Sequence, residues 1–431
     1  MINRFFCLAG ILCCSSSLFS LSIDEALKSS LKHYKLKEAQ EKVKQRKEGK
    51  LQAYSGFLPK VDAKMDLNRQ NQRRSNDQNS GNRRDTTSQY GLSLQQNLFN
   101  GGGTFAAVKE SQAALKQAEY SEEVERQKVI QEAAESYLEL LSLHKALEIN
   151  DANLKFLKQQ YENARQKHEA GEETITNLES ARAQYLEGEI RDLSGKDQLE
   201  NQKHVFVEKT GLDATTIDHL AFPENVKRIP QTVDEAIQTA KKQHPALLQL
   251  DAVIQQKEAS IQQQYAQHLP SVNLNSGYDH RISRSTGQQP FSQPKDKTES
   301  TSIGISAEIN LFNGGKRQAA VREAAHARSE AILNRKRIEN ELNVQIQKYW
   351  TEMKIYDQQM KNYEKVVQAT KVSLNSIMEE QKAGSKTLLD VLEQQKKFFE
   401  AQRALIEAQT KYYKACFGLL ASMGIIKTVV S

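Results

Sequence analysis

The chain contains one long sequence pattern twice. The hexapeptide Asn-Leu-Phe-Asn-Gly-Gly at 97–102 recurs at 310–315, which is 213 residues further on. Three more pairs of landmarks keep nearly this offset and the same order: Asp-Glu-Ala-Leu at 24–27 with Asp-Glu-Ala-Ile at 234–237, Leu-Pro at 58–59 and 269–270, and Ala-Gly at 170–171 and 383–384. The unit is too long to be a solenoid repeat. The pattern therefore predicts two similar structural units, residues 23–211 and 232–431, joined by a linker at 212–231.

Residues 1–22 are predicted to be a secretory signal peptide. Arg4 precedes a short apolar run at 5–14, and Ser20-Leu21-Ser22 offers a small-x-small cleavage site. Cys13 and Cys14 leave open a lipoprotein anchor, although the residues before them are poor ones to precede an acylated cysteine. Cleavage leaves Cys416 as the last cysteine, so we expect no internal disulfide and a buried thiol at that position.

Composition argues against several classes of protein. The formal net charge is +6, from 60 basic and 54 acidic residues, and the basic residues form no nucleic-acid footprint. After the signal no apolar stretch approaches the roughly 20 residues of a membrane helix, so a membrane crossing would have to use strands. The nine histidines are scattered, and no nucleophile elbow, paired-cysteine motif or Walker lysine is present. We therefore expect no enzyme, no cofactor, no metal site and no nucleic-acid partner.

Each repeat is expected to begin with a helix followed by two strands. The helices are predicted at about 23–54 and 233–268, and prolines 59 and 270 stop them. Alternating apolar and polar residues then predict strand–loop–strand segments at about 61–98 and 272–312. Each alternating run has about the length of a tilted transmembrane strand. The polar connections at 70–87 and 283–300 are interpreted as solvated surface loops, with an anion such as lipopolysaccharide left open as a ligand for their arginines.

The glycines after the second strand of each repeat are predicted to form strand-to-helix corners. Glycine adopts the backbone angles that such a corner needs. A phosphate-binding loop is the rival interpretation, but the lysine and hydroxyl signature of such loops is missing. The corner residues are Gly101, Gly102, Gly314 and Gly315.

Long helical hairpins are predicted at about 104–210 and 316–423. Their first arms, 104–169 and 316–382, contain no proline, and their apolar residues recur at steps of three and four, as in coiled coils. An Ala-Gly turn ends each first arm, and Thr174 or Thr387 is expected to start the returning helix.

These elements predict a mixed α and β protein that is mostly α, with four membrane-spanning strands in each chain. Open sheet edges cannot face lipid, so one chain cannot close a barrel alone. Two chains would give eight strands and a filled interior, whereas three would give twelve and leave room for a pore.

The order of the elements resembles that of the TolC family of outer membrane efflux proteins across nearly the whole mature chain. The most specific segment is Ala-Gly-Ser-Lys-Thr-Leu-Leu-Asp-Val-Leu-Glu at 383–393, which is similar to that family's hairpin tip. The resemblance implies a homotrimer with a twelve-stranded barrel in outer membrane lipid of a Gram-negative bacterium and a helical periplasmic tunnel. It also implies passive conduction for a tripartite efflux pump or a type I secretion system, with a periplasmic adaptor and an inner-membrane pump as partners. The alternative is a soluble periplasmic coiled-coil structural or adaptor protein, which would explain the helices but not the strands.

The resemblance also implies roles for residues at the hairpin tips. Asp390 and Glu393 would ring the periplasmic entrance and favour cations, since residues three apart share a helix face. The constriction lock would comprise Lys386, Thr387, Thr176 and Asn177, although the best-known member has an acid at the position of Asn177. The adaptor would dock on Ala170, Gly171, Glu172, Ala383, Gly384 and Ser385.

Overall fold

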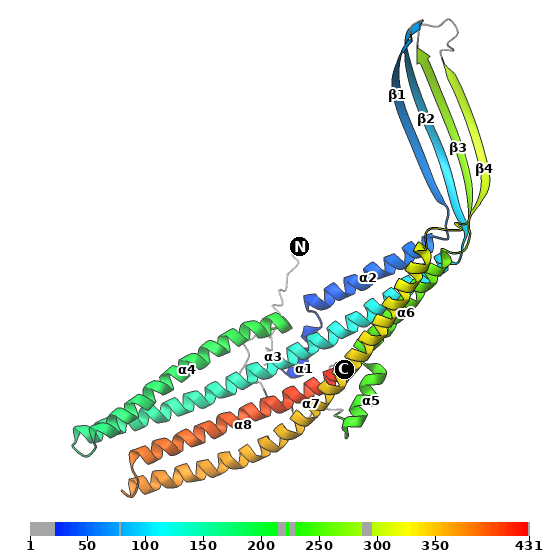
Figure 1. The fold of residues 1–431 in the computed structure, drawn as a ribbon. Coiled ribbons are helices and arrows are strands. Elements are labelled where there is room, and N and C mark those ends of the chain that lie inside the picture. The colour runs from blue at the N-terminus through cyan, green and yellow to red at the C-terminus, as the bar shows by residue number, and fades with distance from the viewer. Residues whose placement is uncertain (1–21, 77–78, 214–220, 224–228, 287–294, 430–431) are drawn as a thin grey trace, which may run out of the picture. The chain divides into compact units, whose positions relative to one another are not determined.

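The computed structural model describes residues 22–76, 79–213, 221–223, 229–286 and 295–429. The chain forms two compact units. The sheet unit comprises residues 38–124 and 243–342, and the hairpin unit comprises the described residues of 1–37, 125–242 and 343–431. Each unit contains segments of both sequence repeats, because the 67-residue helices α3 (Gly103–Glu169) and α7 (Lys316–Lys382) run through both units. The compact units are therefore not the two repeats (Figure 1).

The sheet unit contains one antiparallel sheet in the order β1-β2-β3-β4 (Figure 1). Its strands are β1 (Lys60–Asn76), β2 (Asn79–Asn100), β3 (Ser271–Thr286) and β4 (Asp296–Glu308). The unit also holds most of α2 (Tyr34–Ser55), α6 (Pro245–Ala266) and the first parts of α3 and α7.

The polar connection at 70–87 is not the loop that we expected from its composition. The β1–β2 ladder continues through it, from Gln70 opposite Asp85 to Asn76 opposite Asn79. The second connection is shortened as well, because β3 reaches Thr286 and β4 begins at Asp296. Cross-strand hydrogen bonds join backbone groups, so a ladder can extend beyond the apolar residues that started it.

The hairpin unit is built from four long helical segments and the short helices that close their ends. The later part of α3 packs with α4 (Ile175–Thr210), and the later part of α7 packs with α8 (Leu388–Ser422). The short helices are α1 (Ile23–Ser30), α5 (Val233–Gln243) and the 3-10 helix η2 (Ile426–Val429). One core gathers around Tyr137, Phe206 and Phe417, and a second contains Ile346, Leu419 and the buried Cys416.

Each helix predicted at the start of a repeat is in fact two helices. The segment 23–54 divides into α1 and α2, and 233–268 divides into α5 and α6. A histidine stands at both breaks: His33 Nδ1 accepts the backbone N–H of Lys35 at 3.3 Å, and His244 Nδ1 accepts that of Ala246 at 3.2 Å. Pro245 supplies the second break, because a proline disfavours helical backbone in the residue before it.

The predicted signal peptide and linker lie largely outside the described residues. Of residues 1–22 only Ser22 is described, and it caps α1 by accepting the backbone N–H of Glu25 at 3.3 Å. Of the linker at 212–231, Phe222 stacks on Tyr413 with ring centroids 5.3 Å apart.

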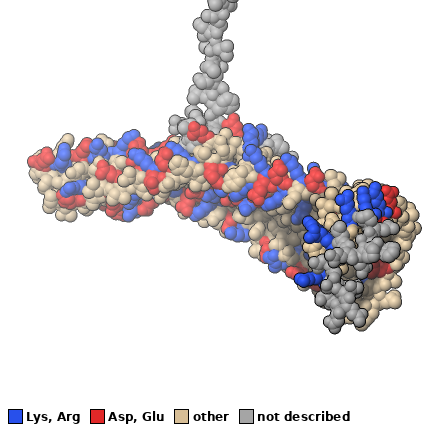
Figure 2. All heavy atoms as spheres, turned by 90° about the horizontal axis from the view of Figure 1, so that it is seen from above, with Lys and Arg blue, Asp and Glu red and all other residues tan. Residues whose placement is uncertain are grey.

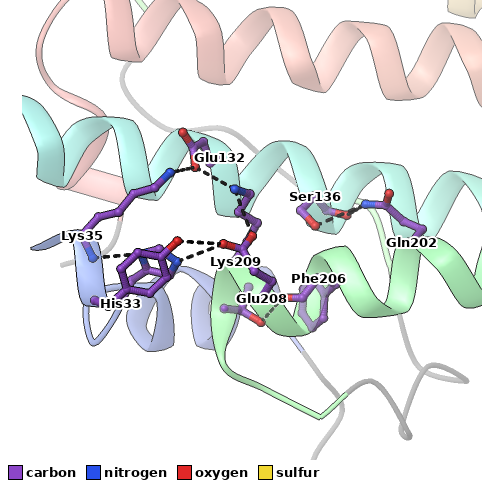
Figure 3. Close-up of polar contacts among 10 residues, drawn as sticks. His33, Lys35, Glu132, Ser136, Gln202, Phe206, Glu208 and Lys209 are labelled. Carbon is purple, nitrogen blue, oxygen red and sulfur yellow. Dashed lines mark hydrogen bonds and ion pairs between the residues drawn. The ribbon is translucent and has the colours of Figure 1, made fainter.

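A charged network holds the α1–α2 turn against α3 and α4 in the hairpin unit (Figure 3). Lys35 Nζ lies 3.1 Å and Lys209 Nζ 3.3 Å from the carboxylate of Glu132. Lys209 also pairs with Glu208 at 3.0 Å, and Glu208 lies 3.6 Å from His33 Nε2. Partial burial raises the pKa of Glu132, but the hydrogen bonds from the two lysines outweigh it and hold this pKa below its ordinary value.

The exposed faces of the helices carry both signs of charge. Figure 2 shows Lys and Arg side chains interspersed with Asp and Glu over the helices. Many are neighbours one turn apart, as in the pairs Lys155 with Asp151 and Lys361 with Asp357, both at 2.6 Å. None of the described helices has a stretch that is long and apolar enough to cross a membrane.

Candidate functional site

Both hairpin tips use the same backbone turn. In the first, Gly171 has φ +79°, and the N–H of Glu172 bonds the carbonyl of Lys167 at 2.8 Å. In the second, Gly384 has φ +80°, and the N–H of Ser385 bonds the carbonyl of Glu380 at 3.0 Å. This is the Schellman arrangement, in which a left-handed glycine lets the chain satisfy the last carbonyls of a helix. The predicted docking residues at 170–172 and 383–385 are all exposed.

A threonine starts each returning helix. Thr174 Oγ1 accepts the backbone N–H of Asn177 at 3.2 Å, and Thr387 Oγ1 accepts that of Asp390 at 3.3 Å. Asn177 and Asp390 therefore occupy the same third position of α4 and α8, 213 residues apart. The predicted lock residue Thr176 is exposed two positions after the first cap.

Asp390 completes a capping box. Its carboxylate accepts the backbone N–H of Thr387 at 2.9 Å and the hydroxyl at 2.8 Å. These bonds from Thr387 lower the pKa of Asp390, and the charge of Lys386 acts in the same direction. The carboxylate is therefore ionised at neutral pH and also stabilises the first turn of α8.

Glu393 lies one turn further along α8, with its side chain 66% exposed, and pairs with Lys397 at 2.7 Å. Leu388 and Leu392 anchor this part of α8, because they pack in one cluster with Leu157, Ala164 and Ala181 of the first hairpin. The structure thus brings Asp390 together with Thr387 and Lys386, whereas Glu393 pairs with a lysine outside the predicted set.

Two further residues of the first tip, Glu173 and His168, lie outside the predicted lock and docking sets. Glu173 Oε1 accepts the side-chain N–H of Asn177 at 2.6 Å and the backbone N–H of Thr174 at 3.2 Å. The ring of His168 lies 2.8 Å from the carbonyl of Glu173. The repeat offset contains the signal: Glu173 corresponds to Lys386, and Asn177 corresponds to Asp390. The acidic residue therefore precedes the capping threonine in the first tip, as Glu173 precedes Thr174, and follows it in the second, as Asp390 follows Thr387.

The strand-to-helix corners share one local design. Gly101 and Gly102 have φ +66° and +84°, and Gly314 and Gly315 have φ +65° and +82°. Before the first pair, Asn100 Oδ1 accepts the backbone N–H of Thr104 at 3.1 Å and caps α3. All four glycines adopt left-handed backbone, which side chains disfavour.

The sheet has one apolar and one polar face. The apolar face carries Val61, Met65 and Leu67 of β1, which are 64%, 71% and 70% exposed in this chain. Ile303 and Ile305 of β4 belong to the same face and are also exposed. The alternate residues, such as Asp62, Lys64 and Asp66, form the polar face.

Within the described residues, no group of three His, Cys, Asp or Glu side chains is arranged to hold a metal ion.

Comparisons with known proteins agree with this architecture. The model of the family described as outer membrane efflux protein matches residues 23–204 and 236–425. The outer membrane efflux protein BepC of Brucella suis is 20% identical over 307 residues, and TolC of Vibrio cholerae is 22% identical over 304. These matches cover 71% and 70% of this chain, and 65% and 68% of the two relatives.

A solved structure has the same fold. The outer membrane protein VceC of Vibrio cholerae superposes with a TM-score of 0.76 at 18% identity, covering 93% of this chain and 96% of VceC. Identity this low shows the fold alone. The match to the family model spans most of the chain and contains both repeats. The chain therefore belongs to the outer membrane efflux protein family and is a protein of the outer membrane, not the soluble periplasmic coiled-coil protein considered as an alternative.

Proposed function

We propose that three copies of this chain form a channel that conducts substrates passively from the periplasm across the outer membrane. The main support for this proposal is a four-stranded sheet that has one exposed apolar face. Its two outermost strands are β1 and β4. Unpaired edges are costly in lipid, so further copies must close the sheet. Three copies supply twelve strands, whereas two supply eight, a number whose interior is filled by side chains.

The energy for transport is proposed to come from partners. An inner-membrane pump, belonging to a tripartite efflux pump or a type I secretion system, would supply the work, and a periplasmic adaptor would join it to this channel. The proposed docking residues are the exposed turns at 170–172 and 383–385. The two turns have the same backbone conformation, but the first carries the charged Glu172 where the second carries Ser385. This difference in charge would let an adaptor distinguish the first hairpin from the second.

The periplasmic entrance is proposed to be lined by Asp390 and Glu393. Both carboxylates lie in the first two turns of α8, on the side away from the anchoring Leu388 and Leu392. Three copies would bring six carboxylates around one axis, and such a ring favours cations. Thr176, Asn177, Lys386 and Thr387 are proposed to shape the constriction through the caps described above.

Single-channel recording in a planar bilayer tests this proposal. The variant Asp390→Asn with Glu393→Gln removes both charges and leaves an amide oxygen at position 390 that can still accept the backbone N–H of Thr387 in the cap. We expect cation selectivity to fall while trimers persist. The control is Glu407→Gln, which breaks a similar exposed pair with Lys411, at 2.6 Å, elsewhere on α8.

The outcomes separate the parts of the proposal. Unchanged selectivity in the double variant removes these carboxylates from the entrance. An equal loss in Glu407→Gln would show a general charge effect instead. Folded protein that never inserts into a bilayer would contradict the channel itself.

A further inference from the structure

The apolar face of the sheet has a defined height. On β3 it carries Val272, Leu274, Tyr278 and Ile282, which alternate with residues of the polar face. From Val272 to Ile282 is ten residues, or about 33 Å along a strand. At a tilt of about 45° this becomes about 23 Å, close to the roughly 25 Å apolar band of an outer membrane barrel. The face therefore reaches the headgroup level just beyond Ile282.

Cationic side chains occupy the apolar face at that level. Lys297 lies opposite Ile282. The next row of residues paired across the strands, closer to the β1–β2 turn, contains Arg69, Thr86 and Arg284. One row further, Arg84 lies opposite Asn71 and donates to its side chain at 3.2 Å. All four cationic side chains are exposed. Figure 2, which looks down on the strand ends, shows Lys and Arg side chains gathered there.

Acidic side chains are absent from these rows of the apolar face among the described residues. The acid of this face closest to them is Glu299, which already pairs with His280 at 3.1 Å. At the same height the polar face is mixed, since it carries Asp85, Asp296 and Arg281. The excess of positive charge is therefore confined to the face that continues the apolar band.

We propose that Arg69, Arg84, Arg284 and Lys297 form a basic belt that binds the phosphate groups of an anionic lipid in the outer leaflet. Guanidinium groups bind phosphate through two parallel hydrogen bonds, and Thr86 and Asn71 add polar groups between them. The acyl chains of the same lipid would lie on the apolar rows below. This inference rests on the proposed membrane position of the sheet.

Lipid binding to the detergent-purified trimer tests the belt, with native mass spectrometry counting bound bisphosphorylated lipid A. Each surface cation contributes about 1 kcal/mol to binding an anionic lipid surface, which is about fivefold in affinity. We expect Arg284→Gln to weaken binding about fivefold and the triple variant Arg69→Gln, Arg84→Gln, Arg284→Gln about a hundredfold. Arg281→Gln is the matched control, because it removes the same charge from the polar face of the same strand.

Two further arms identify the ligand. Dephosphorylated lipid A should bind as weakly to the natural protein as phosphorylated lipid A binds to the triple variant. Millimolar inorganic phosphate should not displace the bound lipid. Displacement would contradict the proposal that the belt binds a lipid and would indicate a site for a free anion. Equal losses in Arg284→Gln and Arg281→Gln would overturn the belt.

Channel recording on the same preparations separates this inference from the proposed function. A trimer that conducts normally but does not distinguish the two lipids contradicts only the belt. A protein that neither inserts nor conducts contradicts the membrane position on which the belt depends.

Discussion

At the scale of single residues, the two repeats place equivalent glycines in different surroundings. A Cβ atom on Gly101 would lie 2.3 Å from the carbonyl oxygen of Ala266 and 2.8 Å from Leu269 Cβ, whereas one on Gly314 would meet nothing within 4 Å. Both residues have nearly the same positive φ. The corner sequence is therefore used twice, but only one copy is enclosed.

Alanine at the two corners should separate backbone strain from steric conflict. Gly314→Ala should cost about 1–2 kcal/mol, the penalty of left-handed backbone. Gly101→Ala carries the same penalty and must also displace the end of α6, so it should lower the thermal midpoint clearly more. Circular dichroism melting of the purified trimers measures both, and equal shifts would contradict the close approach to Ala266.

At the scale of elements, the coiled-coil packing depends on small residues at seven-residue spacing. Gly188 and Gly195 of α4 face α3, and the corresponding positions of α8 are the buried Ala401 and Ala408. Spacing of seven keeps such residues on one helix face. The missing side chains at Gly188 and Gly195 let α4 approach α3 closely.

Two helix-interior glycines should respond oppositely to alanine, although both gain about 1 kcal/mol of helix propensity. At Gly188 the new Cβ lies 3.1 Å from the flexible end of Leu157. At Gly418 it lies 2.5 Å from the rigid ring of Tyr349. We expect Gly188→Ala to be neutral or stabilising and Gly418→Ala to be destabilising in urea unfolding. Equal stabilisation of the two variants would show that helix propensity alone decides and would contradict the steric conflict at Tyr349.

The network around Glu132 should make the hairpin unit sensitive to acid. Because the folded pKa of Glu132 is lowered, its contribution to stability is present above the unfolded pKa, about 4.3, and is lost as pH falls through the folded value. Glu132→Gln should therefore lower the urea midpoint at pH 7. Below about pH 5 the urea midpoint of this variant should fall less steeply with decreasing pH than that of the natural protein. Glu41→Gln, at an exposed pair with Lys44, is the control. A variant that parallels the natural protein at every pH would contradict this role.

At the scale of the whole molecule, the two faces of the sheet predict how it enters a membrane. Ile303 on the apolar face is 78% exposed, and the adjacent Ser302 lies on the opposite face. Ile303→Lys should cost about 2–4 kcal/mol if it lies near the bilayer midplane, and Ser302→Lys much less. Recovery of heat-resistant trimers from outer membrane fractions measures the difference. Equal recovery would contradict the assignment of the faces.

Much of the architecture could be predicted from the sequence because it depends on neighbours along the chain. Alternation identified the apolar face of β1, and the Ala-Gly turns with Thr174 and Thr387 identified where the hairpins reverse. The break before Pro245 was also predictable from the sequence, because a proline disfavours helix in the preceding residue, although our prediction ran one helix through it. Each of these signals acts through backbone preferences within a few residues.

Other features were decided only when distant segments came together. The strands continue past Gln70 because the backbone of β1 finds a partner in β2, whatever its side chains are. The need for glycine at 101 comes from Ala266, and the anchoring of α8 at Leu388 comes from Ala181. The basic belt emerges only from strand register, since Arg69 and Arg284 are far apart in sequence. Local sequence determines which elements form, whereas packing and register between them determine which side chains meet.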